Sequence, residues 1–190
     1  MEPKKVLVLL ANGFEDVEAI TPIDYLRRAG IEVLTVAVGE TLLVKSKWGQ
    51  INIIADIMLT PPICTADWDA VILPGGMPGT TNLAASKDVT TLLNEMHKAK
   101  KLICAICAAP VAVLAPLGIL DGKKFTCYPG LEEAVAHRLN KNQWLEKRVV
   151  VDGNIITSRG AGTAGDFSIT IIEYLLDETE AQKIKETVLL

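Results

Sequence analysis

The segment Leu-Ile-Cys-Ala-Ile-Cys-Ala-Ala-Pro at residues 102–110 places a cysteine where it could act as a nucleophile. Its apolar first half is typical of a buried strand, and the small residues that follow leave no room for a loop before the next helix. Cys107 would therefore lie on a strained strand-to-helix turn, a nucleophile elbow. The positive end of that helix favours the thiolate, so we expect the pKa of Cys107 to be roughly 4–7.5, below the free value of about 8.5. A small buried hydrophobic residue is the alternative interpretation.

Cys104 and Cys107 also form a C-x-x-C pattern, which occurs in redox pairs and zinc sites. If Cys104 still lies in the strand, three residues at about 3.3 Å each place it about 10 Å from Cys107, too far for a disulfide. Cys64 and Cys127 are isolated, so no second C-x-x-C completes a zinc site. We therefore expect no metal, no cofactor and no disulfide framework. The irregular cysteine spacing indicates a reducing, cytoplasmic compartment.

Two glycines follow the apolar run at residues 70–73, in the sequence Pro74-Gly75-Gly76. Glycines let backbone N–H groups turn inward, as an oxyanion or anion-binding site requires. The N–H groups of Gly76 and Ala108 would then hold negative charge on a carbonyl bound to Cys107. An ordinary left-handed turn is the alternative. No Gly-Lys-Ser/Thr follows, which argues against a nucleotide P-loop.

Three acidic residues, Glu15, Asp16 and Glu18, open the first helical pattern at the same predicted sheet edge. Glu15 and Glu18 are three residues apart and share a helix face. A carboxyl group held against a thiolate is pushed toward its neutral, proton-donating form. Glu18 would then carry protons for the cysteine, whereas simple stabilisation of the helix start is the alternative.

A glycine-rich segment, Gly160-Ala161-Gly162-Thr163-Ala164-Gly165, matches the dinucleotide pattern G-x-G-x-x-G. That motif needs a further strand with an acidic residue at its end, and only helical patterns follow here. We reject a dinucleotide site and expect these glycines to let the last helices start close to the cysteine turn. Both histidines, His97 and His137, are predicted to lie on the surface.

Short apolar runs and helical patterns alternate along the chain. Strands are predicted at residues 6–10, 31–38, 70–73, 102–106, 124–127, 148–151 and 154–157, a hairpin within 45–57, and helices up to Gly30 and at 87–98, 107–115, 162–176 and 178–189. This order predicts one α/β domain over residues 1–190, with a doubly wound, mainly parallel sheet between helices. The turns at Gly13, Gly75 and Cys107 would converge at the carboxyl edge of the sheet. A net charge of −4 with scattered lysines argues against nucleic acid, and no apolar run suits a membrane span.

Taken together, these features resemble the DJ-one/ThiJ/PfpI superfamily over nearly the whole chain. The segments that carry the resemblance are residues 6–18, 23–30, 71–76, 105–110 and 157–163. The resemblance implies a flavodoxin-like fold, a homodimer, Cys107 as the reactive cysteine and Glu18 as its protonated partner. It also implies an oxyanion site at the amides of Gly76 and Ala108, and anion binding by Arg28.

One position departs from the family pattern. Many members carry a histidine after the strand predicted to end at Cys127, where this chain has Tyr128-Pro129. Without that imidazole, a Cys-His protease mechanism is unsupported. Glu18 would then have to act as the general acid and base, with Tyr128 as a weak proton donor. Tyr128 and Glu15 would line the pocket.

These residues favour a cofactor-independent glyoxalase or deglycase that acts on small dicarbonyls or their adducts. Cys107 would add to the aldehyde, and Glu18 would move a proton between neighbouring carbons. The alternative is a peroxide-sensing thiol protein with a chaperone or partner-binding role. An inactive structural relative is a third interpretation.

Overall fold

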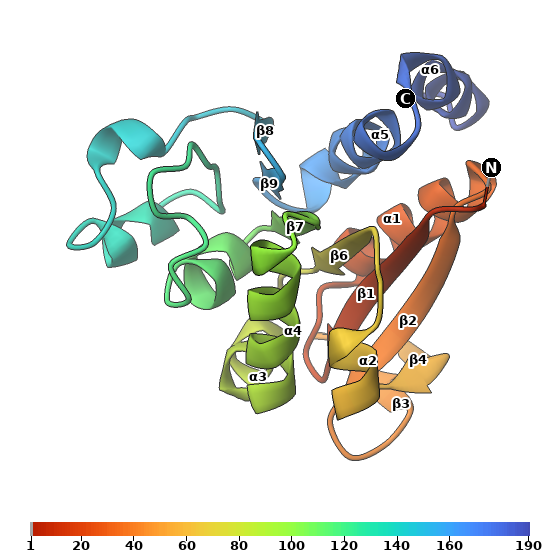
Figure 1. The fold of residues 1–190 in the computed structure, drawn as a ribbon, viewed down its shortest axis with the longest axis horizontal. Helices are drawn as coiled ribbons and strands as arrows, with labels where there is room; N and C mark the ends of the chain where they lie inside the picture. The colour runs from red at the N-terminus through yellow and green to blue at the C-terminus, as the bar shows by residue number, and fades with distance from the viewer. Residues whose placement is uncertain (1) are drawn as a thin grey trace.

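The computed structural model describes residues 2–190, in which strands and helices alternate along the chain (Figure 1). The strands are β1 (Lys5–Ala11), β2 (Glu32–Val38), β3 (Leu43–Lys45), β4 (Asn52–Ile54), β5 (Ile57–Met58), β6 (Ala70–Leu73), β7 (Leu102–Ile106), β8 (Val149–Asp152) and β9 (Ile155–Ser158). The α-helices are α1 (Asp16–Arg28), α2 (Pro61–Thr65), α3 (Gly79–Ala85), α4 (Lys87–Lys98), α5 (Ala164–Leu175) and α6 (Glu178–Thr187). Shorter helical turns are η1 (Pro110–Leu114), η2 (Leu131–Val135), η3 (Lys141–Gln143) and η4 (Ala161–Thr163).

The main sheet has the strand order β5-β2-β1-β6-β7-β9-β8, and only the β8–β9 pair is antiparallel. Its central order β2-β1-β6-β7-β9 is that of a doubly wound, flavodoxin-like sheet. The predicted α/β architecture is therefore confirmed. Strands β3 and β4 form a separate antiparallel hairpin, which begins two residues before the segment 45–57 where a hairpin was expected.

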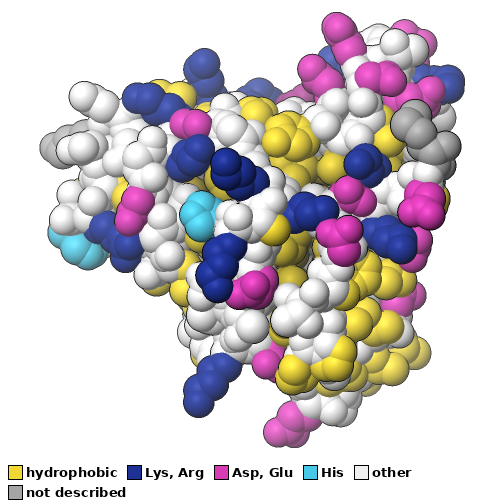
Figure 2. Space-filling model, in the orientation of Figure 1, with side chains coloured by type: hydrophobic (Ala, Val, Ile, Leu, Met, Phe, Trp, Pro, Cys, Tyr) yellow, Lys and Arg dark blue, Asp and Glu magenta, His cyan; other side chains and the backbone are white. Residues whose placement is uncertain are grey.

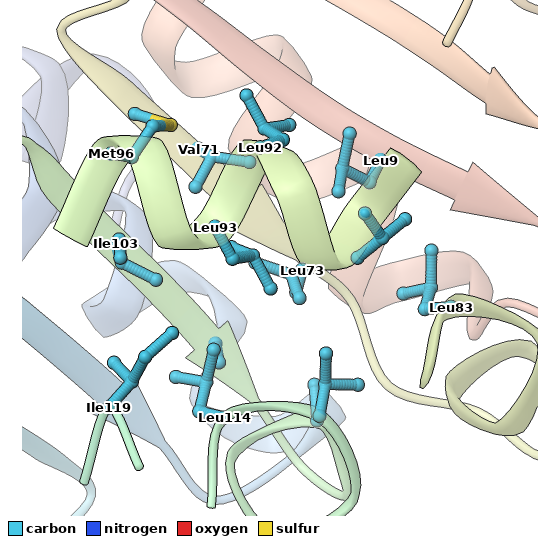
Figure 3. Packing of buried hydrophobic residues seen from close by; sticks show 14 of the residues in the cluster. Leu9, Val71, Leu73, Leu83, Leu92, Leu93, Met96, Ile103, Leu114 and Ile119 are labelled. Carbon is cyan, nitrogen blue, oxygen red and sulfur yellow. The ribbon is translucent and has the colours of Figure 1, made fainter. Parts of the chain in front are cut away.

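Successive side chains along the strands point to opposite faces of the sheet and pack into two hydrophobic layers. Leu7 and Leu9 of β1 belong to one layer, and Val6 and Val8 belong to the other. A strand buried on both faces reads as a continuous apolar run, which is why the central strands were visible in the sequence. Figure 3 shows the first layer, where Leu92, Leu93 and Met96 of α4 pack over β6 and β7. Helices α1 and α5 cover the opposite face.

Two local predictions were wrong. Residues 124–127 do not form a strand, because Phe125 makes only an isolated bridge with Trp144 and the N–H of Thr126 donates to the Thr157 hydroxyl. The helix expected from Cys107 to Ala115 is also not a regular α-helix. Its core is a π-helical turn, η1, in which the Ala115 N–H donates to the Pro110 carbonyl. Helix α3 was not predicted.

Candidate active site

Cys107 lies in the predicted tight turn between β7 and η1. Its φ is +64°, a left-handed conformation that is costly for a residue with a side chain. The Cys107 N–H donates to the Ser158 carbonyl at 3.0 Å, and the Cys107 carbonyl accepts the Tyr128 N–H at 2.9 Å. These bonds from two other segments hold the strained backbone in place. Among the four cysteines, all of them free, only Cys107 is partly exposed.

The glycine turn after β6 packs directly against this cysteine. A Cβ atom at Gly75 would lie 2.5 Å from the Cys107 Cβ and 3.0 Å from its Sγ, so no larger residue fits. At Gly76, with φ +94°, a Cβ would lie 2.5 Å from the backbone of Gly13 and Glu15. The turns at Gly13, Gly75 and Cys107 therefore converge at the carboxyl edge of the sheet. The N–H groups of Gly76 and Ala108 lie close enough to the Cys107 sulfur to lower its pKa.

Glu18 reaches the same sulfur from the first turn of α1. Glu18 is only 1 % exposed and accepts the Gly75 N–H at 2.8 Å. Its Oε2 and the Cys107 Sγ would both contact a Cβ atom at Gly75, at 2.4 and 3.0 Å. Burial, followed by the charge of Glu15, raises the pKa of Glu18 to about 7, although Cys107, Gly75 and Lys47 act in the opposite sense. A carboxyl group with this pKa is suited to exchange protons near neutral pH.

The low pKa expected for Cys107 is wrong. Burial, followed by the charge and hydrogen bond of Glu18, raises the pKa of Cys107 to about 12, against the lowering by Ala108 and Gly76. The sequence shows the helix start but not that a carboxylate lies beside the sulfur. Because burial raises the pKa of both groups and the Glu18 charge raises that of Cys107 further, they cannot both be ionised near neutral pH, and they titrate as a pair. A thiolate at Cys107 therefore requires the shared proton to reside on Glu18.

The structure does not bring all the expected residues to this point. Glu15 caps α1 and accepts the Glu18 N–H at 2.8 Å. Tyr128 is 53 % exposed, and its ring lies beside Gly160. Arg28 lies ten residues beyond Glu18 in α1, about 15 Å along the helix, and pairs with Asp24 at 2.9 Å. Arg28 is therefore remote from the cysteine.

Two basic residues that the sequence reasoning missed lie near the site. Lys47, in the β3–β4 hairpin, is close enough to Glu18 to lower its pKa. Arg159 directly follows β9, the neighbour of the cysteine strand. Arg159 could have been found from the sequence, because it directly follows a buried apolar run. Nothing in the sequence distinguishes Lys47 from the other lysines.

Cys104, the glycine-rich segment and the two histidines have surroundings that differ from those of Cys107. Cys104 is fully buried, and burial raises its pKa well above the ordinary value. The G-x-G-x-x-G segment leads through η4 into α5, and no strand follows within the described residues. Both histidines are exposed. Over residues 2–190 no three His, Cys, Asp or Glu side chains are grouped as metal ligands, and no helix is long and apolar enough to cross a membrane.

Comparison with known proteins finds relatives over most or all of this chain. The chain is 37 % identical to the Danio rerio Parkinson disease protein 7 homolog, over 100 % of this chain and 99 % of the relative. It is 35 % identical to the Caenorhabditis elegans glutathione-independent glyoxalase DJR-1.2, over 90 % and 89 % of the two chains. The Arabidopsis thaliana DJ-1 homolog B is 38 % identical over 95 % of this chain, which spans only 40 % of that longer protein.

Structural comparison agrees. The structure of oxidised Toxoplasma gondii DJ-1 superposes with a TM-score of 0.91 at 35 % identity, covering 98 % of both chains. The sequence itself matches the DJ-1/PfpI family over residues 4–174, which contain the cysteine turn, Glu18 and the glycine turn. The chain therefore belongs to the DJ-1/PfpI family.

Proposed function

We propose that this protein is a cofactor-independent glyoxalase or deglycase that removes small dicarbonyls such as methylglyoxal, or their adducts, in stress protection. The observation that carries the proposal is the meeting of three groups at one sulfur. Cys107 supplies the nucleophile, Glu18 accepts its proton, and the N–H groups of Gly76 and Ala108 point at the place where negative charge develops.

The first step follows from the shared proton. The Cys107 thiol passes its proton to Glu18 as the sulfur attacks the aldehyde carbon of methylglyoxal. The aldehyde oxygen becomes an alkoxide beside the two N–H groups, and a proton from Glu18 converts it to the hydroxyl of a hemithioacetal.

The remaining steps move a proton between carbons. Glu18 removes the proton from the former aldehyde carbon, which gives an enediolate, and returns it to the neighbouring carbon. The hydroxyl proton of the first carbon passes to the oxygen of the second. The product is a thioester of lactate on Cys107. Water cleaves the thioester, which releases lactate and restores the thiol. No oxidant and no external thiol takes part.

The nematode relative is named a glutathione-independent glyoxalase, which supports this choice of reaction. We also propose a cytosolic protein, since its four cysteines are free. A homodimer is part of the proposal, because exposed hydrophobic side chains gather around β3 and β4 (Figure 2). They include Trp48 at 67 % and Ile54 at 75 % exposure, and Val17 and Ile20 of α1 are exposed as well. Apolar patches of this kind favour association.

The test is lactate formation from methylglyoxal by the purified protein, without glutathione or added metal. We expect turnover above the buffer rate, with lactate formed in proportion to methylglyoxal lost. Loss of methylglyoxal without lactate would indicate stoichiometric trapping by surface amines. Absence of both changes would refute the proposal.

A second candidate function is redox sensing at the same cysteine. The related Toxoplasma gondii structure is described as oxidised, and Cys107 is the partly exposed thiol here. Peroxide would convert the thiolate to a sulfinate held by the same N–H groups and by protonated Glu18, with a chaperone or partner-binding role as the output. If lactate formation is absent and dilute peroxide adds two oxygens to Cys107 alone, this second function is favoured.

A further inference from the structure

A cleft of about 440 Å³ opens next to the cysteine turn. It is lined by Tyr128, Pro129, Arg148, Arg159 and residues 160–163. A Cβ built on Gly160, in this lining, would lie 3.7 Å from Glu18 Oε1 and 3.6 Å from the Tyr128 ring. The Tyr128 N–H in turn donates to the Cys107 carbonyl. The cleft therefore borders the cysteine–carboxylate pair without containing either residue.

The two arginines of the cleft differ in how fully they are engaged. Arg148 donates to Asp166 at 2.6 Å and to the Gly162 carbonyl at 2.7 Å. Arg159 makes one long contact, 3.3 Å to Glu146, whose side chain is 71 % exposed. An exposed pair of this kind is a weak competitor for a guanidinium with five N–H donors. Of the two arginines in this cleft, Arg159 is therefore the one whose guanidinium has N–H donors left for a ligand.

The sheet register sets the distance between this cation and the nucleophile. Ser158 pairs with Ile106 across β7 and β9, and its carbonyl accepts the Cys107 N–H. Arg159 is the next residue, so its backbone lies about 5 Å from that of Cys107, the spacing of neighbouring strands. The Arg159 side chain therefore starts one strand spacing from the nucleophile and lines the cleft that borders it.

We infer that Arg159 forms an anion subsite, and that the substrates favoured by Cys107 are 2-oxoaldehydes that carry a carboxylate a few carbons from the aldehyde. The substrate part of this inference rests on the proposed function. Arginine binds carboxylates through paired, charge-assisted hydrogen bonds, and the lined cleft gives the ligand chain room. The neighbouring Glu15, Glu18 and Glu146 would repel an anion if Arg159 were absent.

Alkylation of Cys107 tests the subsite without any turnover. Iodoacetate and iodoacetamide transfer groups of nearly the same size to the thiol, but only iodoacetate carries a carboxylate. We expect Arg159→Gln to slow iodoacetate at Cys107 by about 5–20-fold and to change iodoacetamide by less than about twofold. Arg159→Lys, which keeps the charge, should retain part of the preference. Rates are read by mass spectrometry of the peptide that contains Cys107.

Arg138→Gln is the matched control, because Arg138 is paired with Asp121 away from the cleft. It removes the same charge and should change neither rate. If Arg159→Gln slows both reagents equally, Arg159 is only structural, and an unchanged ratio in that variant also overturns the inference. Should Arg159→Gln fail to fold, added salt replaces it. The wild-type preference for iodoacetate over iodoacetamide must then fall as ionic strength rises, and a preference insensitive to salt overturns the inference.

Turnover then tests the substrate class. Measured as kcat/KM, 4,5-dioxopentanoate should be preferred over its neutral methyl ester by about tenfold, and Arg159→Gln should abolish that preference while sparing methylglyoxal. Equal values for acid and ester in the wild type would refute the substrate class. If neither compound is turned over, the proposed function fails, whereas the alkylation ratio still decides whether Arg159 binds anions.

Discussion

Replacing Cys107 by serine is expected to reduce lactate formation from methylglyoxal to the uncatalysed rate, a loss of about 10³-fold or more. The serine hydroxyl has nearly the size of the thiol, so the turn and its hydrogen bonds to Ser158 and Tyr128 should persist. A hydroxyl holds its proton far more tightly than a thiol, and Glu18, with a pKa of about 7, is too weak a base to remove it. The measurement is the initial rate of lactate formation.

Cys64→Ser and Cys127→Ser are the matched controls. Both cysteines are buried and burial raises the pKa of each, so neither should take part in turnover. Each variant should keep most of the activity of the folded protein. Substantial lactate formation by Cys107→Ser would mean that a different residue attacks the carbonyl.

Replacing Glu18 by glutamine is expected to lower kcat by about 10²–10⁴-fold, the usual contribution of a positioned acid or base. Glutamine keeps an oxygen that can accept the Gly75 N–H, so the glycine turn should stay in place. It can neither take the Cys107 proton nor move a proton between the two carbons. The initial rates of the purified variant and the wild type, compared at saturating methylglyoxal, give this ratio.

The same variant should be more stable than the wild type at alkaline pH. The pKa of Glu18 is raised from 4.5 in the unfolded chain to about 7 in the folded protein. The stabilisation that the protonated Glu18 carboxyl group contributes to the folded protein is thus fully present below pH 4.5. It is lost as the pH rises through about 7, which lowers the free energy of unfolding of the wild type by about 3 kcal/mol. Glutamine does not ionise. We therefore subtract the free energy of unfolding of the wild type from that of Glu18→Gln. This difference should increase by about 3 kcal/mol between about pH 4 and pH 8.

Urea unfolding at both pH values gives this difference. A constant difference between Glu18→Gln and the wild type would show that Glu18 is charged at all these pH values. A loss of activity together with a gain of stability would mark Glu18 as a residue kept for function.

The parts of this protein that were predictable from the sequence are those set by local patterns. Strands β6 and β7 and helix α4 were expected with their observed ends, because apolar runs and helix caps depend only on residues that are close together in the sequence. The turn at Cys107 was predictable for the same reason. Residues 124–127 have a strand-like composition, but they lie against η3 and β9 instead of joining the sheet ladder.

Effects that depend on distant segments were not predictable. The pKa of Cys107 is set by Glu18, 89 positions away, and by burial, neither of which the segment around the cysteine reveals. Arg28 lies close to Glu18 in sequence but at the other end of α1, whereas Arg159 is distant in sequence and adjacent in the sheet. Register across the sheet, and not distance along the chain, decides which charges meet the cysteine.

The pH dependence of Cys107 alkylation tests most directly the central claim, that Cys107 and Glu18 share one proton. The rate with iodoacetamide would be followed by mass spectrometry from about pH 5 to pH 10 in the wild type and in Glu18→Gln. In the wild type the rate should rise with a midpoint near 7 and then level off, because the pair loses its first proton there. In Glu18→Gln that step should vanish, and the rate should rise only at alkaline pH, since burial still raises the pKa of the thiol. Identical profiles in the two proteins would contradict the account.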